Sequence, residues 1–184
     1  MAGKDRMALK NRLASDPDFL RHYGMFHAVF SSLDAMVDLG IGKLLRLTPA
    51  ETHLLTVGLD FGRRVQILID IAEHNDHQNK TAMISALKKI QAESRRNAFA
   101  HSFISSSATT VTFNYRHREK SLDPKQYTYT GPEFQKHVYS FVQTGNDFQE
   151  ALGVDGEEFD AFLAAAFKAD SSVTTSPEPP SAKT

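Results

Sequence analysis

The 184-residue sequence contains no cysteine and no tryptophan. The absence of cysteine excludes disulfide bonds, zinc sites built from thiolates and cysteine nucleophiles. A long apolar run is also lacking, and the first residues are charged, so we expect neither a signal peptide nor a membrane span. These absences predict a cytoplasmic protein that does not associate with a membrane.

An excess of charge of either sign is missing as well. The 21 basic and 22 acidic residues give a formal net charge of -1. Contact with a nucleic acid would therefore need a local basic patch. The length fits one domain with tails, and we expect that domain over residues 15–154, after a polar leader over residues 1–14.

The first helix is expected to begin at Ser15-Asp16-Pro17-Asp18, where an acidic cap precedes a proline. Apolar residues then recur in alternating steps of four and three, which is typical of one long amphipathic helix. We expect Gly40 and Gly42 to interrupt it. The residues of this apolar stripe are Phe19, Tyr23, Phe26, Phe30, Leu33 and Val37.

Two more helices follow. Thr48-Pro49-Ala50-Glu51 has the pattern of a capping box and predicts a helix that continues to about Glu73. Gly58 and Gly62 each weaken that helix by about 1 kcal/mol relative to alanine, unless they mark close helix packing. After a polar turn, a third helix is expected from about Lys80 to Ala98.

The last third of the chain changes pattern. Alternating β-branched and aromatic residues predict a small hairpin over about residues 109–130. Thr130-Gly131-Pro132-Glu133 then opens a closing helix, residues 155–168 favour an accessory helix, and residues 169–184 lack the apolar residues needed for an ordered structure. The predicted fold class is all-α, an antiparallel bundle of four to five helices with a small β-hairpin insertion.

The run Arg95-Arg96-Asn97-Ala98-Phe99-Ala100-His101 carries the strongest chemical signal. A guanidinium offers fixed donors to a phosphate, and an imidazole can move a proton near neutral pH. Metal-free cleavage of RNA uses groups of these two kinds, one to stabilise charge on the phosphate and one to move a proton. Arg96, Asn97 and His101 are therefore the candidate catalytic residues, and we expect no metal and no cofactor.

The spacing of these residues constrains how such a site is built. On an ideal helix Arg96 and His101 are separated by about 140° around the axis and about 7.5 Å along it, whereas Asn97 and His101 share one face. One straight helix does not aim Arg96 and His101 at one phosphate. Either the helix frays near Ala100 or a second protomer contributes, and the geometry favours a composite site in a homodimer.

The run Arg96-Asn97-Ala98-Phe99-Ala100-His101 resembles the R-x(4-6)-H signature of the HEPN family, many of whose members are ribonucleases. The order of the predicted elements over about Asp16 to Leu152 is also similar to that family. The resemblance implies a metal-independent endoribonuclease in which Arg96 and His101 from two chains line one cleft. It also implies that the protein could be the toxin of a toxin–antitoxin pair, with an antitoxin as its partner.

Basic residues near the motif are candidate RNA contacts. Lys88, Lys89 and Arg95 form a local positive patch with Arg96. Glu93, one turn before Asn97, is either a residue that orients the site or an ordinary ion-pair partner of Lys89, and the ion pair is slightly favoured. A second basic cluster, at the hairpin tip, is either an RNA contact or simply solvated, and we favour solvation. Its candidate RNA-binding residues are Arg116 and Arg118.

Three alternatives remain open. Cations at a helix end also arise from a favourable interaction with the helix dipole. A HEPN-like domain that binds a nucleotide, RNA or a protein without cutting anything would use the same residues. The run from Glu73 to His77 holds metal-ligand atoms, but its spacing matches no zinc pattern and a polar turn explains it better.

Overall fold

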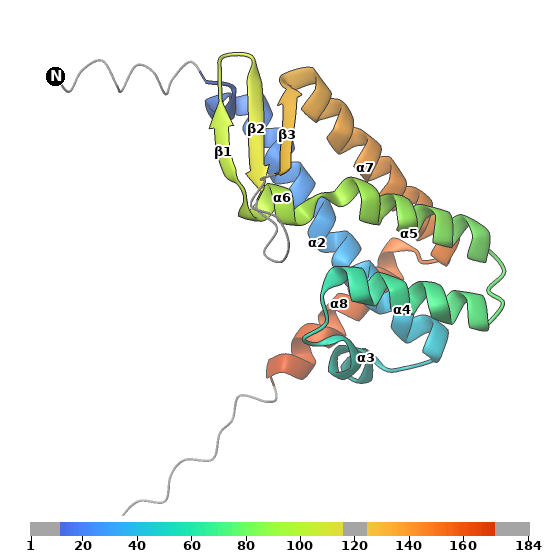
Figure 1. The fold of residues 1–184 in the computed structure, drawn as a ribbon. Helices are drawn as coiled ribbons and strands as arrows, with labels where there is room; N and C mark the ends of the chain where they lie inside the picture. The colour runs from blue at the N-terminus through green and yellow to red at the C-terminus, as the bar shows by residue number, and fades with distance from the viewer. Residues whose placement is uncertain (1–11, 116–124, 172–184) are drawn as a thin grey trace, which may run out of the picture.

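The structure is a computed structural model that describes residues 12–115 and 125–171. The protein is mostly helical, with a small antiparallel sheet at one end (Figure 1). The expected hairpin tip and the tail beyond residue 171 lie outside the described residues. The elements are η1 (Leu13–Ser15), α2 (Pro17–Leu45), α3 (Pro49–Thr56), α4 (Phe61–His74), α5 (Lys80–Ser94), α6 (Arg96–His101), β1 (Phe103–Ser106), β2 (Thr110–Tyr115), β3 (Lys125–Thr130), α7 (Gly131–Leu152) and α8 (Gly156–Ser171).

The first helix is longer than the sequence predicts. It begins where expected, with the Asp16 side chain accepting from the backbone of Asp18 and Phe19. The expected interruption at Gly40 and Gly42 is wrong, because α2 continues to Leu45. A Cβ on Gly42 would lie 2.3 Å from the Thr52 hydroxyl, so this glycine lets α3 pack closely against α2.

The predicted second helix is two helices. The capping box is confirmed at the start of α3, with Thr48 and Glu51 bonded reciprocally. However, α3 ends at Thr56 because Gly58 takes a left-handed conformation, at φ 83°, that turns the chain. Asp60 then caps α4 by accepting from the backbone N–H of Arg63 at 2.9 Å.

The predicted third helix is also divided. It was expected to run to Ala98, but α5 ends at Ser94 because Arg95 adopts a left-handed conformation at φ 38°. The six-residue helix α6 follows at once. The expected hairpin is present as β2 and β3, and the unpredicted strand β1 pairs antiparallel with β2 to make a three-stranded sheet.

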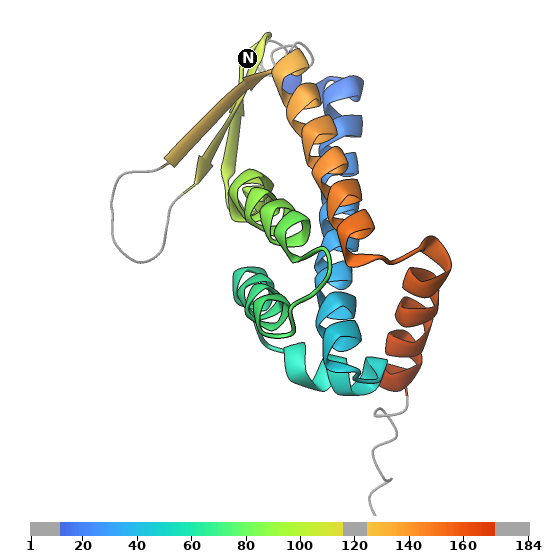
Figure 2. The ribbon, with the colours of Figure 1, turned by 90° about the vertical axis from the view of Figure 1, so that its right-hand side faces the viewer.

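The helices pack in two directions around one core (Figures 1 and 2). Helices α4 and α5 run antiparallel to each other, as predicted for the bundle; α4 packs against α2 and α5 packs against α7. Helix α7 lies beside α2 and runs in the same direction, so the bundle is not antiparallel throughout. The physical reason is the sheet: its strands return the chain to the end of the molecule where α2 begins. None of the described helices is both long and apolar enough to cross a membrane.

Candidate functional site

Helix α6 contains the whole Arg96–His101 motif, and contacts of its central residue Phe99 hold it in place. The Phe99 side chain is buried and meets the rings of Phe26 and Phe113 edge to face at 4.7 Å. The Tyr23 hydroxyl donates to the Phe99 backbone carbonyl at 2.7 Å. These contacts hold the short helix against α2 and the sheet. Its remaining polar side chains, Arg96, Asn97 and His101, are exposed.

The turn before α6 depends on Arg95. Its guanidinium lies 4.5 Å from the centre of the Tyr127 ring and donates to the Tyr129 hydroxyl. Burial raises the pKa of Tyr129, while the charge of Arg95 acts in the opposite direction. The backbone of Arg95 is in the left-handed conformation, which costs a non-glycine residue about 1–3 kcal/mol. The side chain of the same residue makes these contacts with β3.

A cleft of about 890 Å³ opens at the start of α6. It lies where α6 and the end of α5 meet the start of α4, the middle of α2, the end of β2 and the start of β3. Its volume falls in the usual range for small-ligand sites. The cations in its lining are Arg64, Arg95, Arg96 and Lys125, the carboxylates are Asp34 and Asp60, and the aromatic rings are Phe30, Phe61, Tyr115 and Tyr127.

Arg96 reaches this cleft without an ionic partner. Its guanidinium lies 5.6 Å from the centre of the Phe30 ring. Within the described ranges, no carboxylate forms an ion pair with Arg95 or Arg96. Burial lowers the pKa of His27, and the charge of Arg96 acts in the same direction. Arg96 therefore supplies positive charge and free N–H donors, which are the requirements for holding a phosphate.

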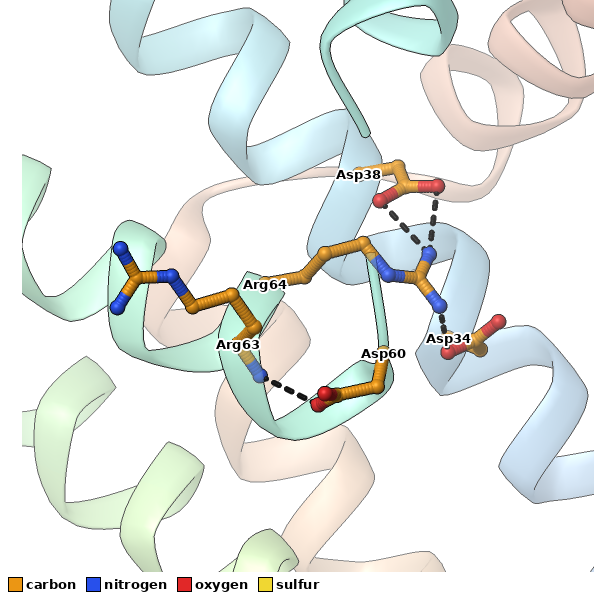
Figure 3. Close-up of polar contacts among 5 residues, drawn as sticks. All are labelled: Asp34, Asp38, Asp60, Arg63 and Arg64. Atoms are coloured by element: carbon orange, nitrogen blue, oxygen red, sulfur yellow. Dashed lines mark hydrogen bonds and ion pairs between the residues drawn. The ribbon is translucent and has the colours of Figure 1, made fainter. Parts of the chain in front are cut away.

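The opposite wall is built around Arg64, whose two terminal guanidinium nitrogens donate to aspartates while its buried Nε has no partner among the described residues (Figure 3). One guanidinium nitrogen donates to both oxygens of Asp38 at 2.9 and 2.8 Å, and the other donates to Asp34. Burial opposes the charge on Arg64, but these hydrogen bonds outweigh it and raise its pKa. Burial also raises the pKa of Asp38, although Arg64 pulls it down. This group joins α2 to α4.

The structure separates the predicted catalytic residues. Arg96 and Asn97 line the cleft together with Arg95, but His101 does not. His101 is the last residue of α6, exposed to solvent. Because α6 is a regular helix without fraying at Ala100, the separation of about 140° holds within one chain. Within one chain, His101 therefore does not share the cleft with Arg96.

The other predicted residues are distributed more widely. Lys88 and Lys89 are exposed on α5 and do not line the cleft. The Glu93 carboxylate accepts from the Thr144 hydroxyl of α7 at 3.4 Å. The predicted RNA contacts Arg116 and Arg118 lie outside the described residues.

The sequence analysis missed most of the cleft. Asp34 and Arg64 are separated by thirty residues and meet only through the packing of α2 on α4. Lys125 and Tyr127 enter the cleft from β3. The N-cap position of Asp60 was hidden because one continuous helix was predicted there. Asp34 and Asp38 are the exception. They are four residues apart, so they lie on the same face of α2, and that spacing in the sequence indicates that one cation could bind both.

The polar turn predicted after α4 is present, with Asp76 paired to Lys80. In the described ranges, no group of three or more acidic or histidine side chains is placed to hold a metal ion.

Searches of protein-family models, curated proteins and solved structures found no match to this chain. The resemblance to HEPN domains therefore rests on the motif and the order of the elements.

Proposed function

We propose that the protein is a metal-independent endoribonuclease of the HEPN type. The observation that carries this proposal is the position of Arg96 and Asn97, which face a cleft without an ionic partner for Arg96, on the same short helix as an exposed His101. An unpaired guanidinium in a cleft is suited to a phosphate group. An accessible imidazole on the same element is suited to proton transfer.

In the proposed reaction the 2′-hydroxyl oxygen attacks the adjacent phosphorus and loses its proton to a base; His101 is either that base or the acid that protonates the leaving 5′-oxygen. The bond from phosphorus to the 5′-oxygen breaks, and that oxygen leaves with a proton from an acid or from water. The products are a 2′,3′-cyclic phosphate and a 5′-hydroxyl. Arg96 stabilises the charge on the phosphorane, and Asn97 orients the phosphate or the histidine.

The proposal includes a homodimer, because His101 lies outside the cleft of its own chain. Across a twofold axis, His101 of one copy would meet Arg96 of the other, giving two equivalent sites. An antitoxin protein is the further partner that the family resemblance suggests. RNA is the proposed substrate, in the cytoplasm.

A second candidate is a module that binds a nucleotide, RNA or a protein without cleavage. The separation of His101 from Arg96 favours it, because the cleft of one chain has binding groups but lacks the histidine. In that case replacing Arg96 would change affinity, and no RNA would be cut.

The experiment incubates the purified wild-type protein with mixed RNA in EDTA and identifies the product ends. We expect cyclic-phosphate ends from the wild type, none from His101→Ala, and normal cleavage from His53→Ala, which removes an exposed histidine of α3. A requirement for a divalent metal, or full activity of His101→Ala, would contradict the mechanism. Failure to cut any RNA would favour the binding module.

Mixing two inactive variants tests the composite site. A heterodimer of Arg96→Ala and His101→Ala chains contains one site in which both residues are intact. We expect the mixture to recover activity that neither variant has alone. No recovery, with subunit exchange verified by native mass spectrometry, would place both residues of each site in one chain and contradict the dimer.

A further inference from the structure

The cleft at α6 has two walls of opposite charge. Arg95 and Arg96 stand at its α6 end, while the carboxylates of Asp34 and Asp60 line the same cleft from α2 and from the turn before α4. A site for the phosphate backbone alone would gain nothing from carboxylates, because they repel phosphates. Arg64 neutralises Asp34, so Asp60 is the carboxylate of this wall without an ion pair in the described ranges, and it suits a ligand with a hydrogen-bond donor at one end and negative charge at the other.

Asp60 is the carboxylate best placed to meet such a donor. One of its oxygens accepts from the backbone N–H of Arg63 at 2.9 Å, as Figure 3 shows. The other carboxylate oxygen has no partner among the described residues, and Asp60 is exposed to solvent. Asp34 differs, because Arg64 engages it directly. Asp60 thus keeps one acceptor oxygen without a partner and forms no ion pair within the described ranges.

Nucleotides with an amino group on the base match both walls. The phosphate provides the negative end, and the amino group of cytosine, adenine or guanine provides donors that a carboxylate accepts. The half-buried rings of Phe61 and Tyr127 also line the cleft and offer apolar surface to a base. Uracil matches poorly, since its single N–H lies between two carbonyl oxygens that repel a carboxylate.

We propose that this cleft binds single-stranded RNA with an amino-bearing base against Asp60 and the neighbouring phosphate at Arg96, and that it discriminates against uracil. The inference deepens the proposed function and rests on it for the choice of RNA as the ligand. It assigns Asp60 as a specificity residue that does not take part in the chemistry.

The test measures binding without cleavage. Fluorescein-labelled 2′-fluoro octamers of cytidine and of uridine have no 2′-hydroxyl nucleophile and differ at the base edge, so fluorescence anisotropy in EDTA reports affinity alone. For the wild type we expect about tenfold tighter binding of the cytidine octamer, the usual effect of one hydrogen bond to a charged group.

The variant Asp60→Asn removes the charge but retains an N-cap, because asparagine caps helices as well as aspartate does. We expect it to lose the preference for cytidine and to bind the uridine octamer more tightly than the wild type does. Asp16→Asn makes the same change at the cap of α2, outside the cleft, and should keep the preference. Thermal unfolding of both variants verifies that they fold.

Equal affinity of the wild type for the two octamers, no binding of either, or an unchanged preference in Asp60→Asn would overturn the inference. Its failure is distinguishable from failure of the proposed function, because cleavage is measured separately on ordinary RNA. Cleavage without a base preference in binding would refute only the inference. A preference that depends on Asp60, without cleavage, would refute only the nuclease.

Discussion

Two arginines on opposite walls of one cleft have opposite surroundings. Arg64 has a side chain only 12% exposed and divides its donors between two aspartates. Arg96 is exposed, touches the face of the Phe30 ring and has no ionic partner in the described part of the chain. The same side chain thus joins two helices in one place and presents unused donors in the other.

This contrast distinguishes structural arginines from functional ones. A guanidinium whose donors are taken by carboxylates of its own protein has little left for a ligand, whereas a guanidinium supported by rings keeps its hydrogen-bonding capacity. Net charge or local sequence would not separate the two cases, because both arginines have a second arginine beside them in the chain.

The largest expected effect is on cleavage by Arg96→Ala. We predict that kcat falls by about 100- to 1000-fold, as when one preorganised donor to a charged transition state is removed. Single-turnover cleavage assays measure it. Arg63→Ala is the matched control, because it removes another exposed arginine that does not line the cleft, and it should cleave normally. Equal losses in the two variants would erase the contrast between Arg96 and an ordinary surface arginine.

Arg64→Ala should chiefly affect stability. Removing the guanidinium leaves the partly buried Asp34 and Asp38 without their cation, and we predict a loss of about 2–3 kcal/mol in the free energy of unfolding. Urea denaturation measures it. Arg96→Ala is the comparison and should stay within about 0.5 kcal/mol of the wild type. A larger loss in Arg96→Ala than in Arg64→Ala would reverse the roles assigned here.

The smallest expected effect is a pH dependence near Arg95. Burial lowers the pKa of His137, and the charge of Arg95 acts in the same direction. The folded state then binds a proton less readily than the unfolded state, so stability is complete above the unfolded pKa of about 6.5 and declines as the pH falls below it. His27 contributes in the same direction.

Urea titrations at pH values from 7.5 to 5 measure this slope, which is limited to about 1.4 kcal/mol per pH unit for each proton. His137→Phe removes the titrating group from its aromatic surroundings and should flatten the slope. Gln143→Ala, an exposed change on the same helix, should not. Stability that rises as the pH falls over this range would contradict the sign.

Local signals in the sequence predict local structure well here. The apolar stripe of α2 is confirmed, since Phe19, Phe26 and Phe30 are buried. The capping box at Thr48 stands where predicted, and α7 begins at the predicted Thr130-Gly131-Pro132-Glu133. Each depends on residues within a few positions of one another. The short strand β1 was missed because its four residues are two apolar residues followed by two serines, with no alternation of apolar and polar.

What could not be predicted depends on contacts distant in sequence. The end of α5 at Arg95 has no glycine or proline to mark it, and the contacts of that arginine come from Tyr127 and Tyr129, on a strand thirty residues later. Likewise, the motif identified Arg96 and Asn97, but the acidic wall of the cleft required the packing of α2 against α4. Local pattern therefore revealed one wall of the candidate site and not the other.

The side-by-side placement of α2 and α7 has a consequence for folding. The two helices pack together although α3, α4, α5, α6 and the sheet separate them along the chain, so their contact has a large loop-closure cost. During synthesis the aromatic face of α2 emerges long before the helix that covers it. The nascent chain consequently exposes part of this hydrophobic stripe until α7 has left the ribosome, and transiently exposed apolar surface of this kind favours aggregation.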